Sequence, residues 1–548
     1  MNWVNVATSG CLLLAGSSLA AQDALDRTDP FQQVERERPM AQPEQPVRIE
    51  TRPVLEMPAS TLMGDAVDVG AIVIDGLAAL DRADYAAVIE PFAGRRLTRA
   101  ELRGLTDAVA NHARERGYIL ATAWIAEQTL VGGVLRVTVD EGGLDDIRIE
   151  GSDDPAIRSQ LQRLLMNQPL TLAVLQREIL LADDLPGVRI RNTRFERDGD
   201  RRILVVDARR EDFAGSVLVA SDGTRPVGPV RARIDLDANG LISPRDRVDL
   251  SFSATPLDPD ELAFFSARYS MVVNDSGTNL GVFGSYSRTE PGAYLAAREL
   301  QGESWRGGLR MRHPLLRGQR RSLWLEASAE LQDLRQDRLD SLARHDRIAL
   351  ARIGFYGFGP LAGGTLQGRA TISQGLDILG ATALGDPLAS RSDAPPGFTT
   401  LSWWLNWRHS LAARLSLSLE ASGQLSTDPL LIGENFALGG NAFLRGYDFA
   451  QRIGDQGIAG VGELRYDWRD ALGAIERVQL YAFADGGTVT NLADGRGSGT
   501  LASSGAGLRA DINRTLDFDL EVAVPLTEPR YDTDDNSPRI NVRVSQSF

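Results

Sequence analysis

The chain has 548 residues and a formal net charge of −15, from 74 acidic and 59 basic side chains. Its length allows several domains, and its single cysteine, Cys11, excludes a disulfide framework and a thiolate metal site. No run reaches the roughly 18 apolar residues that a membrane-spanning helix needs. Every basic residue is arginine, so the choice of arginine at any one position carries little information.

The first segment of the chain resembles a secretory signal. The apolar run 11–21 contains the small-x-small pattern Ser18-Leu19-Ala20 before polar residues, although no basic side chain precedes the run. We interpret residues 1–21 as a signal peptide, with a soluble N-terminal helix as the alternative. Cys11 would leave with the signal, and the mature chain would then contain no thiol.

A linker is predicted to follow the signal peptide. Residues 22–66 are rich in Pro, Gln, Glu and Arg, a composition that cannot form a core of its own. One helix-capable piece, residues 30–38, could dock elsewhere in the protein as a plug.

Two consecutive segments show the same order of predicted elements, β-α-α-β-β. In residues 67–142, Thr98-x-x-Glu101 is a capping box that opens the second helix. Residues 143–210 repeat the order and end in a hairpin around Asp198-Gly199. The elements are expected at 69–74, 81–92, 98–116, 118–127 and 134–140 in the first segment, and at 144–149, 155–165, 172–183, 188–196 and 202–208 in the second.

From residue 211 to the end, the sequence alternates with period two. Each strand of about ten residues has one apolar face and one face that carries charges, which is typical of a transmembrane β-barrel. The 338 residues of 211–548, at about 20 residues per strand and turn, predict about sixteen antiparallel strands. Trp468 and Tyr481 near strand ends suit an aromatic girdle, or line the lumen. Examples of the apolar faces are Leu415, Leu417 and Leu419; Leu250 and Phe252; Leu516, Phe518 and Leu520; and Leu323 and Leu325.

Two motifs in the barrel segment point to a loop that folds into the pore. Leu444-Arg445-Gly446-Tyr447 places one arginine on a glycine-flanked loop, and Phe483-Ala-Asp485-Gly-Gly487 places one acid on a strand. An arginine and a carboxylate form a strong charge-assisted bond where water is scarce. Gly439 and Gly440 would let the loop double back into the lumen. We therefore expect Arg445 and Asp485 to latch the loop tip to the barrel wall.

The mature chain resembles the two-partner secretion transporters of Gram-negative outer membranes, the TpsB or haemolysin secretion/activation family. The resemblance covers residues 67–548. It rests on the hairpin Gln128-x-Leu130-x-x-Gly133-x-Leu135 through Gly142, on His313-Pro314-Leu315-Leu316-Arg317, on the two motifs above with Phe436, and on the C-terminal Phe548.

The resemblance implies two periplasmic POTRA domains, at 67–142 and 143–210, before a barrel at 211–548. It implies that Gln128, Leu135 and Gly142 face the substrate and that Phe436, Gly439, Gly440, Phe483 and Gly487 support the inward loop. Phe548 would be the signal that the outer-membrane assembly machinery reads. The implied activity is export of one unfolded, β-helical exoprotein to the cell surface.

Several other functions are less well supported by the residues. The Arg-rich stretch 189–202 contains interleaved acids and favours a solvated face over nucleic-acid binding. Asp532, Asp534 and Asp535 lack the spacing of a calcium loop and are predicted to lie between the last two strands. No nucleophile elbow or metal motif suggests an enzyme, and we expect no cofactor. A monomer in outer-membrane lipid is expected. An insertase for other barrels and a passive porin are the alternative functions.

Overall fold

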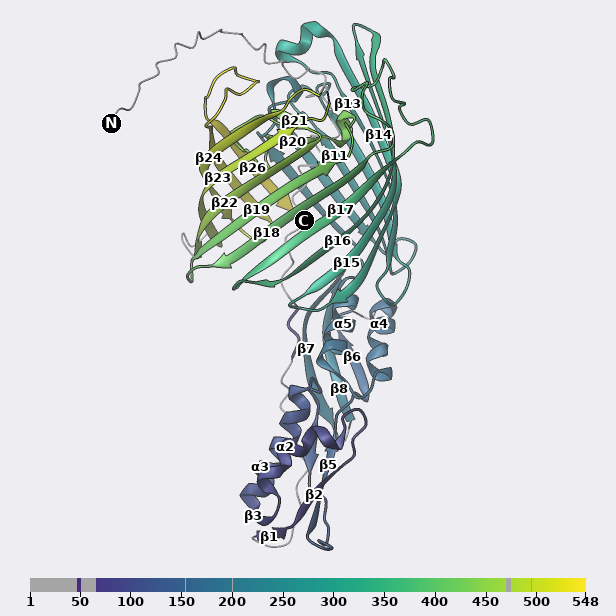
Figure 1. Ribbon diagram of the computed structural model, residues 1–548, viewed down its shortest axis with the longest axis vertical. Coiled ribbons are helices and arrows are strands. Elements are labelled where there is room, and N and C mark those ends of the chain that lie inside the picture. Colours follow the sequence, from purple (N-terminus) through teal and green to yellow (C-terminus); the bar gives the residue numbers. More distant parts are fainter. Residues whose placement is uncertain (1–46, 51–65, 153, 200, 470–474, 494) are drawn as a thin grey trace, which may run out of the picture.

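The computed structural model describes residues 47–50, 66–152, 154–199, 201–469, 475–493 and 495–548. The predicted signal peptide, Cys11 and the helix-capable piece 30–38 lie outside the described residues. Two small α+β units stand in a row beneath a β-barrel, with the first unit farthest from the barrel (Figure 1). No helix among the described residues is long and apolar enough to cross a membrane.

The first unit is a three-stranded sheet covered by helices. Its strands lie in the order β2-β5-β4, with β2 parallel and β4 antiparallel to the central β5. The predicted capping box is present: the Thr98 hydroxyl accepts from Glu101 N, and the Glu101 carboxylate accepts from Thr98 N. The elements are β1 (Ala66–Val69), β2 (Ala71–Asp75), η2 (Arg82–Tyr85), α2 (Ala86–Ile89), η3 (Glu90–Phe92), β3 (Arg95–Thr98), α3 (Arg99–Glu115), β4 (Thr122–Trp124) and β5 (Val134–Asp140).

Two elements of the first unit differ from the prediction. The strand expected at 69–74 is divided at Gly70, because the amides of Gly70 and Ala71 both donate to Gly133 O and end the pairing of β1 with β3. The strand expected at 118–127 is reduced to β4. Before β4 the chain turns, with Ala121 N donating to Tyr118 O, and after β4 the Gln128 side chain takes the place beside β5.

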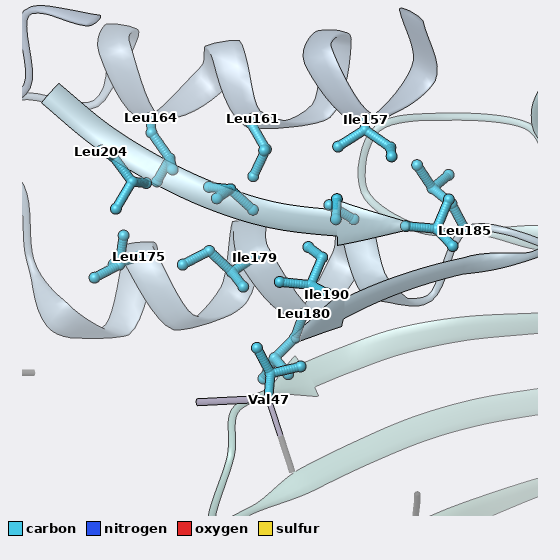
Figure 2. Close-up of a cluster of buried hydrophobic side chains, with 14 of the residues drawn as sticks. Val47, Ile157, Leu161, Leu164, Leu175, Ile179, Leu180, Leu185, Ile190 and Leu204 are labelled. Carbon is cyan, nitrogen blue, oxygen red and sulfur yellow. The ribbon is translucent and has the colours of Figure 1, made fainter. Parts of the chain in front are cut away.

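The second unit repeats this topology, with strand order β6-β8-β7 and β6 parallel to β8. Its elements are β6 (Asp146–Glu150), α4 (Pro155–Met166), α5 (Leu172–Asp183), β7 (Val188–Asp198) and β8 (Arg201–Arg210). Leucine and isoleucine side chains of both helices interdigitate with those of the sheet (Figure 2). Val47, from the segment before the first unit, packs at the edge of the same cluster (Figure 2). The shared topology supports the predicted repeat.

The remaining chain forms a closed barrel of sixteen antiparallel strands, which confirms the predicted fold class. In chain order the strands are β9 (Phe213–Ala220), β10 (Arg231–Asn239), β11 (Asp246–Ala254), β12 (Ala263–Val272), β13 (Asn279–Thr289), β14 (Leu300–Arg317), β15 (Ser322–Arg338), β16 (Ser341–Leu361), β17 (Gly364–Leu376), β18 (Thr399–Ser410), β19 (Leu415–Ser426), β22 (Gln456–Arg469), β23 (Arg477–Thr490), β24 (Gly499–Asp511), β25 (Leu516–Pro525) and β26 (Arg539–Ser547). β26 pairs with β9 and closes the barrel.

The alternation of side chains follows the predicted faces. Leu250 and Phe252 are exposed on the outer surface of β11, whereas Ser251 and Ser253 between them are buried. On β25, Leu520 and Val522 are exposed and Glu521 is buried. A barrel whose apolar residues face outward and whose charged residues face a packed interior is suited to lipid.

Candidate functional site: the inward loop and its contacts with the barrel wall

Residues 427–455, between β19 and β22, fold back into the barrel. Within them, the short strands β20 (Phe436–Leu438) and β21 (Arg452–Gly454) pair as an antiparallel ribbon at the barrel end remote from the two units (Figure 1). The 3-10 helix η6 (Ile432–Glu434) also lies in this segment. Two further 3-10 helices lie in other barrel loops, η4 (Arg225–Val227) between β9 and β10 and η5 (Ala293–Arg298) between β13 and β14. Leu444 and Tyr447 at the loop tip are fully buried.

The loop tip is a tight turn pressed against the barrel wall. Leu444 has φ = 61°, a left-handed conformation, and its carbonyl accepts from Tyr447 N at 2.9 Å. A Cβ atom on Gly446 would lie 2.8 Å from Ser503 Cβ and 2.9 Å from the main-chain N of Pro525. Only glycine allows this close approach of the tip to β24 and β25.

Arg445 and Asp485 meet at the loop tip. The main-chain N–H of Arg445 donates to Asp485 Oδ2 at 3.0 Å. Arg445 Nη1 lies 2.7 Å from Glu521 and 3.1 Å from Glu463, whereas Nε is 3.8 Å from Asp485. The structure therefore places Arg445 beside Asp485 at the loop tip, as expected. The shortest bonds of the guanidinium go to acids on β25 and β22, and the Asp485 carboxylate mainly holds the backbone of the tip.

Ser503 extends this network to a fourth strand. Its hydroxyl donates to Asp485 Oδ1 and accepts from the N–H of Gly446 at 3.1 Å. The tip is thus bound across the adjacent strands β22 to β25. Arg445, Asp485, Glu463 and Glu521 are each less than 8% exposed, so these bonds form where little water competes.

Aromatic rings of β23 lie beside the Arg445 guanidinium. Arg445 Cζ lies 3.4 Å from the centroid of the Phe483 ring, a cation–π contact. The Tyr481 hydroxyl donates to Glu521 at 3.0 Å, and its side chain is 4% exposed. Tyr481 is therefore a lumen residue and not part of a girdle, whereas Trp468 is 45% exposed on the outer surface.

The inward limb of the loop precedes Leu444, and the outward limb follows the tip. Both limbs have further contacts with the barrel. Glu434 on the inward limb binds Arg352 of β16 at 2.6 Å. The Tyr447 hydroxyl bonds Thr527 Oγ1 at 2.7 Å, and Asp448 binds Arg530 at 2.6 Å. Thr527 and Arg530 belong to the loop between β25 and β26, so that loop covers the outward limb.

The predicted loop-supporting residues lie around these limbs. Gly439 and Gly440 both have φ = 102°, and a Cβ on Gly439 would lie 2.1 Å from Asp448 O, so the limbs touch there. A Cβ on Gly487 would lie 2.9 Å from Leu438 Cδ2. The ring of Phe436 lies against Gly457 of β22 in the same way.

Two residues assigned to the substrate have structural positions instead. Leu135 is fully buried in the core of the first unit, which corrects its assignment as substrate-facing. Gly142 has φ = 84° and lies against Leu120, where a Cβ would be 2.5 Å from the Leu120 carbonyl carbon. Its carbonyl accepts from Leu170 N at 2.9 Å, a bond that joins the two units.

The side chains of Gln128 and Phe548 both contact the main chain of neighbouring strands, at Arg136 of β5 and at Gly215 of β9. The Gln128 amide donates to Arg136 O at 2.8 Å and accepts from Arg136 N at 2.9 Å, so it acts as an added rung beside β5. Phe548 exchanges two main-chain bonds with Gly215, and its exposed ring lies over that glycine.

A cavity of about 690 Å³ adjoins the loop inside the barrel. It is lined by more arginines than acids, and the lining includes Arg306, Arg352, Arg408, Glu420, Glu434 and Arg445.

Among the described residues, no group of three or more His, Cys, Asp or Glu side chains is arranged to hold a metal ion. Asp532 lies in the loop between the last two strands, as predicted, and accepts from Arg225 N at 3.0 Å. The contacts around Arg445 form a network that holds the loop against the barrel wall.

Comparison with known proteins agrees with this architecture. The chain is 40% identical to the outer membrane transporter CdiB of Escherichia coli over 93 residues, which cover 17% of this chain and only 16% of that protein. It is 21% identical over 398 residues to the heme/hemopexin transporter protein HuxB of Haemophilus influenzae, covering 68% of this chain and 67% of that protein.

Solved structures show the same fold. CdiB from Escherichia coli superposes with a TM-score of 0.73 at 23% identity, over 91% of this chain and 94% of that chain. BamA from Haemophilus ducreyi lacking POTRA domains 1–3 gives a TM-score of 0.51 at 14% identity, over 88% of this chain and all of that chain.

Family models match two stretches of the chain. Residues 67–142 match the POTRA domain of the ShlB type. Residues 199–510, more than half of the chain, match the haemolysin secretion/activation protein ShlB/FhaC/HecB. The chain therefore belongs to the ShlB/FhaC/HecB family of haemolysin secretion/activation proteins.

Proposed function

We propose that the chain is an outer-membrane pore that takes an unfolded exoprotein from the periplasm and delivers it to the cell surface. Family membership puts the barrel in the outer membrane and the units before it in the periplasm. The observation that carries the proposal is the loop tip held at Arg445 inside a barrel that two periplasmic units precede. We propose that release of this loop opens the path for the exoprotein.

Recognition is proposed to use the sheet edges of the two POTRA units. An extended peptide adds to a sheet edge through main-chain hydrogen bonds and needs no particular side chains for affinity. The chain's own residues 47–50 already use the β7 edge in this manner: Arg48 N donates to Arg191 O at 3.1 Å, and Thr193 N donates to Arg48 O at 2.8 Å. Phe195 N also donates to the Glu50 carboxylate at 2.7 Å. An exoprotein segment would compete with this stretch for β7.

Passage through the barrel is proposed to require movement of the inward loop, since the loop lies in the lumen and contacts both β16 and the β22–β25 wall. No bond is made or broken in this transport, so we assign no enzymatic step and no cofactor. The proposed partners are a β-helical exoprotein, outer-membrane lipid and the barrel assembly machinery that reads Phe548, and the transporter is proposed to act as a monomer.

A second candidate is an insertase that assembles other barrels into the outer membrane. The fold that the chain shares with BamA favours this alternative. The POTRA model of the ShlB type and the presence of two units favour secretion.

Deletion of the gene, followed by comparison of the medium and outer-membrane proteomes, distinguishes the two functions. We expect loss of a single large secreted protein, while other barrels stay at their usual level. Restoring the unaltered gene should return that protein to the medium. A broad fall in outer-membrane barrels with an unchanged medium would contradict secretion and support the insertase.

A further inference from the structure

Asp222, in the loop that follows β9, is a buried carboxylate with partners from three other parts of the barrel. It is 6% exposed. Its oxygens lie 2.9 Å from Arg231 of β10 and 2.8 Å from Arg543 of β26. Its Oδ2 also accepts from the side-chain amide of Asn441 in the inward loop at 2.6 Å. These contacts are separate from those that hold the Arg445 tip on β22 to β25.

The position of Asp222 matters because β9 and β26 form the seam that closes the barrel. The two strands pair from Ala220–Arg543 to Ser216–Ser547, with further main-chain bonds from Ser221 N to Val542 O at one end and between Gly215 and Phe548 at the other. β9 and β10 pair from Ala220–Arg231 to Phe213–Ala238. Asp222 lies directly beyond the end of the seam pairing that is remote from the periplasmic units. Its bond to Arg543 therefore joins the first strand to the last by side chains where the ladder stops.

Arg539 of β26 ties the inward loop to the same point. One guanidinium nitrogen donates to Tyr447 O at 2.7 Å, and the other donates to the main-chain carbonyl of Asp222. Arg539 is 4% exposed. The loop thus contacts β26 through the Tyr447 carbonyl and the residue after β9 through Asn441.

We infer that Asp222 and Asn441 form a second latch, which fastens the inward loop to the closing seam and makes loop position and seam closure depend on each other. A loop that leaves the lumen must break bonds to both sides of the seam and leave a buried carboxylate short of one donor. Seam opening must likewise separate Asp222 from Arg543 and release Asn441. By thermodynamic linkage, whatever favours one movement favours the other by the same factor.

Cross-linking across the seam tests this coupling without any exoprotein, so its outcome does not depend on the proposed secretion function. Val219 and Val544 are paired in register on the outer surface of β9 and β26, and neither belongs to the latch. With Cys11 replaced by serine, Val219→Cys and Val544→Cys should form a disulfide under mild oxidation whenever the seam is closed.

Asn441→Ala is the decisive variant, because it removes the loop contact and keeps the ion pairs of Asp222. We expect the disulfide yield to fall by about threefold or more in Asn441→Ala and further in Asp222→Ala, since removing one partner of a buried network is strongly destabilising. Asp235→Ala is the matched control: this acid on β10 pairs with Arg233 of the same strand, 2.8 Å away. Its yield should equal that of the parent pair.

Only variants whose barrel migrates as folded in semi-native gels are compared. If Asp222→Ala fails this criterion, Asn441→Ala and the control decide alone. An unchanged yield in Asn441→Ala would overturn the inference, because seam closure would then not depend on the contact between Asn441 and Asp222. An equal loss in Asp235→Ala would overturn it as well, since any lumen acid would then have the same effect.

Discussion

The main-chain N–H of Arg445, and not its guanidinium, forms the hydrogen bond to Asp485, with 3.0 Å between N and Oδ2. The guanidinium spans to Glu521 and Glu463 on two other strands. The tip of the inward loop therefore has two separable attachments, one through its backbone and one through its charge.

Arg445→Ala should insert into the outer membrane and secrete poorly. The substitution removes the cation that Glu521 faces inside the barrel, and loss of one partner of a buried ion pair costs about 3–5 kcal/mol. Glu463 keeps Arg465 and Arg509 as partners, so the barrel itself should persist. Exoprotein in the medium, divided by transporter in the membrane, measures the effect. Secretion like that of the unaltered protein at equal membrane level would show that the latch is dispensable.

Asp485→Asn and Asp485→Ala should differ clearly in how much exoprotein they secrete. An asparagine carbonyl still accepts from the N–H of Arg445, and the Ser503 hydroxyl is able to accept from the new amide. Asp485→Asn should therefore retain most secretion, whereas Asp485→Ala should lose it, because a buried N–H left without an acceptor costs about 1–3 kcal/mol. The same secretion assay ranks the two. Equal, severe loss in both variants would indicate that the charge of Asp485 is what matters.

Two adjacent glycines of β23 provide a matched pair. A Cβ on Gly487 would lie 2.9 Å from both Leu438 Cδ2 and Ile458 O, whereas the nearest atom to a Cβ on Gly486 is 3.7 Å away. Gly487→Ala should displace β20 and raise protease cleavage of the inward loop by surface-added enzyme. Gly486→Ala should behave like the unaltered protein. If both variants are cleaved at the same rate as the parent, close packing at Gly487 does not hold the loop.

Arg317 and Asp184 form one of the contacts that join the second unit to the barrel. Arg317 at the end of β14 makes a two-pronged bond to Asp184 just after α5, at 2.7 and 2.8 Å. Asp184 is partly exposed, so the pair is worth about 1 kcal/mol or less. Arg317→Ala should broaden the distance distribution between spin labels on the second unit and the barrel, and leave stability almost unchanged. Arg320→Ala, in the adjoining turn, is the control and should leave the distribution narrow.

The second unit should become more stable as the pH falls toward mildly acidic values. Burial raises the pKa of Glu178 above its usual range, although Arg163 and the Gln160 amide oppose this. The folded state then binds more protons than the unfolded state between the ordinary and the raised pKa, so the free energy of unfolding rises as pH falls through that window. Urea unfolding, followed by the far-UV signal of the helices, should show this rise as the pH falls toward the ordinary glutamate pKa of about 4.3. Glu178→Gln should flatten the dependence; an identical slope in the variant would assign it to another group.

Local patterns in the sequence determined much of the architecture. Period-two alternation in segments such as Leu415–Ser426 is sufficient to predict a lipid-facing strand, because neighbouring side chains of a strand always point to opposite faces. The capping box at Thr98 and Glu101 marks the start of α3 for an equally local reason. The number of strands followed from length alone, since a barrel strand and its turn need a nearly constant number of residues.

Contacts across the lumen were decided only by the tertiary structure. Sequence spacing does not reveal that Glu521 and Glu463 meet Arg445, because inward-facing acids occur on many strands and the loop's path selects among them. The Asp222–Asn441 contact joins residues 219 positions apart, and it exists only because the closed register brings β9 and β26 together. Leu135 was misassigned for the same reason, and the two alternatives for Tyr481 stayed open: burial depends on which elements pack over a side chain. The sequence determines which face of each strand a residue occupies, and closure of the barrel around the folded-in loop decides which residue it meets.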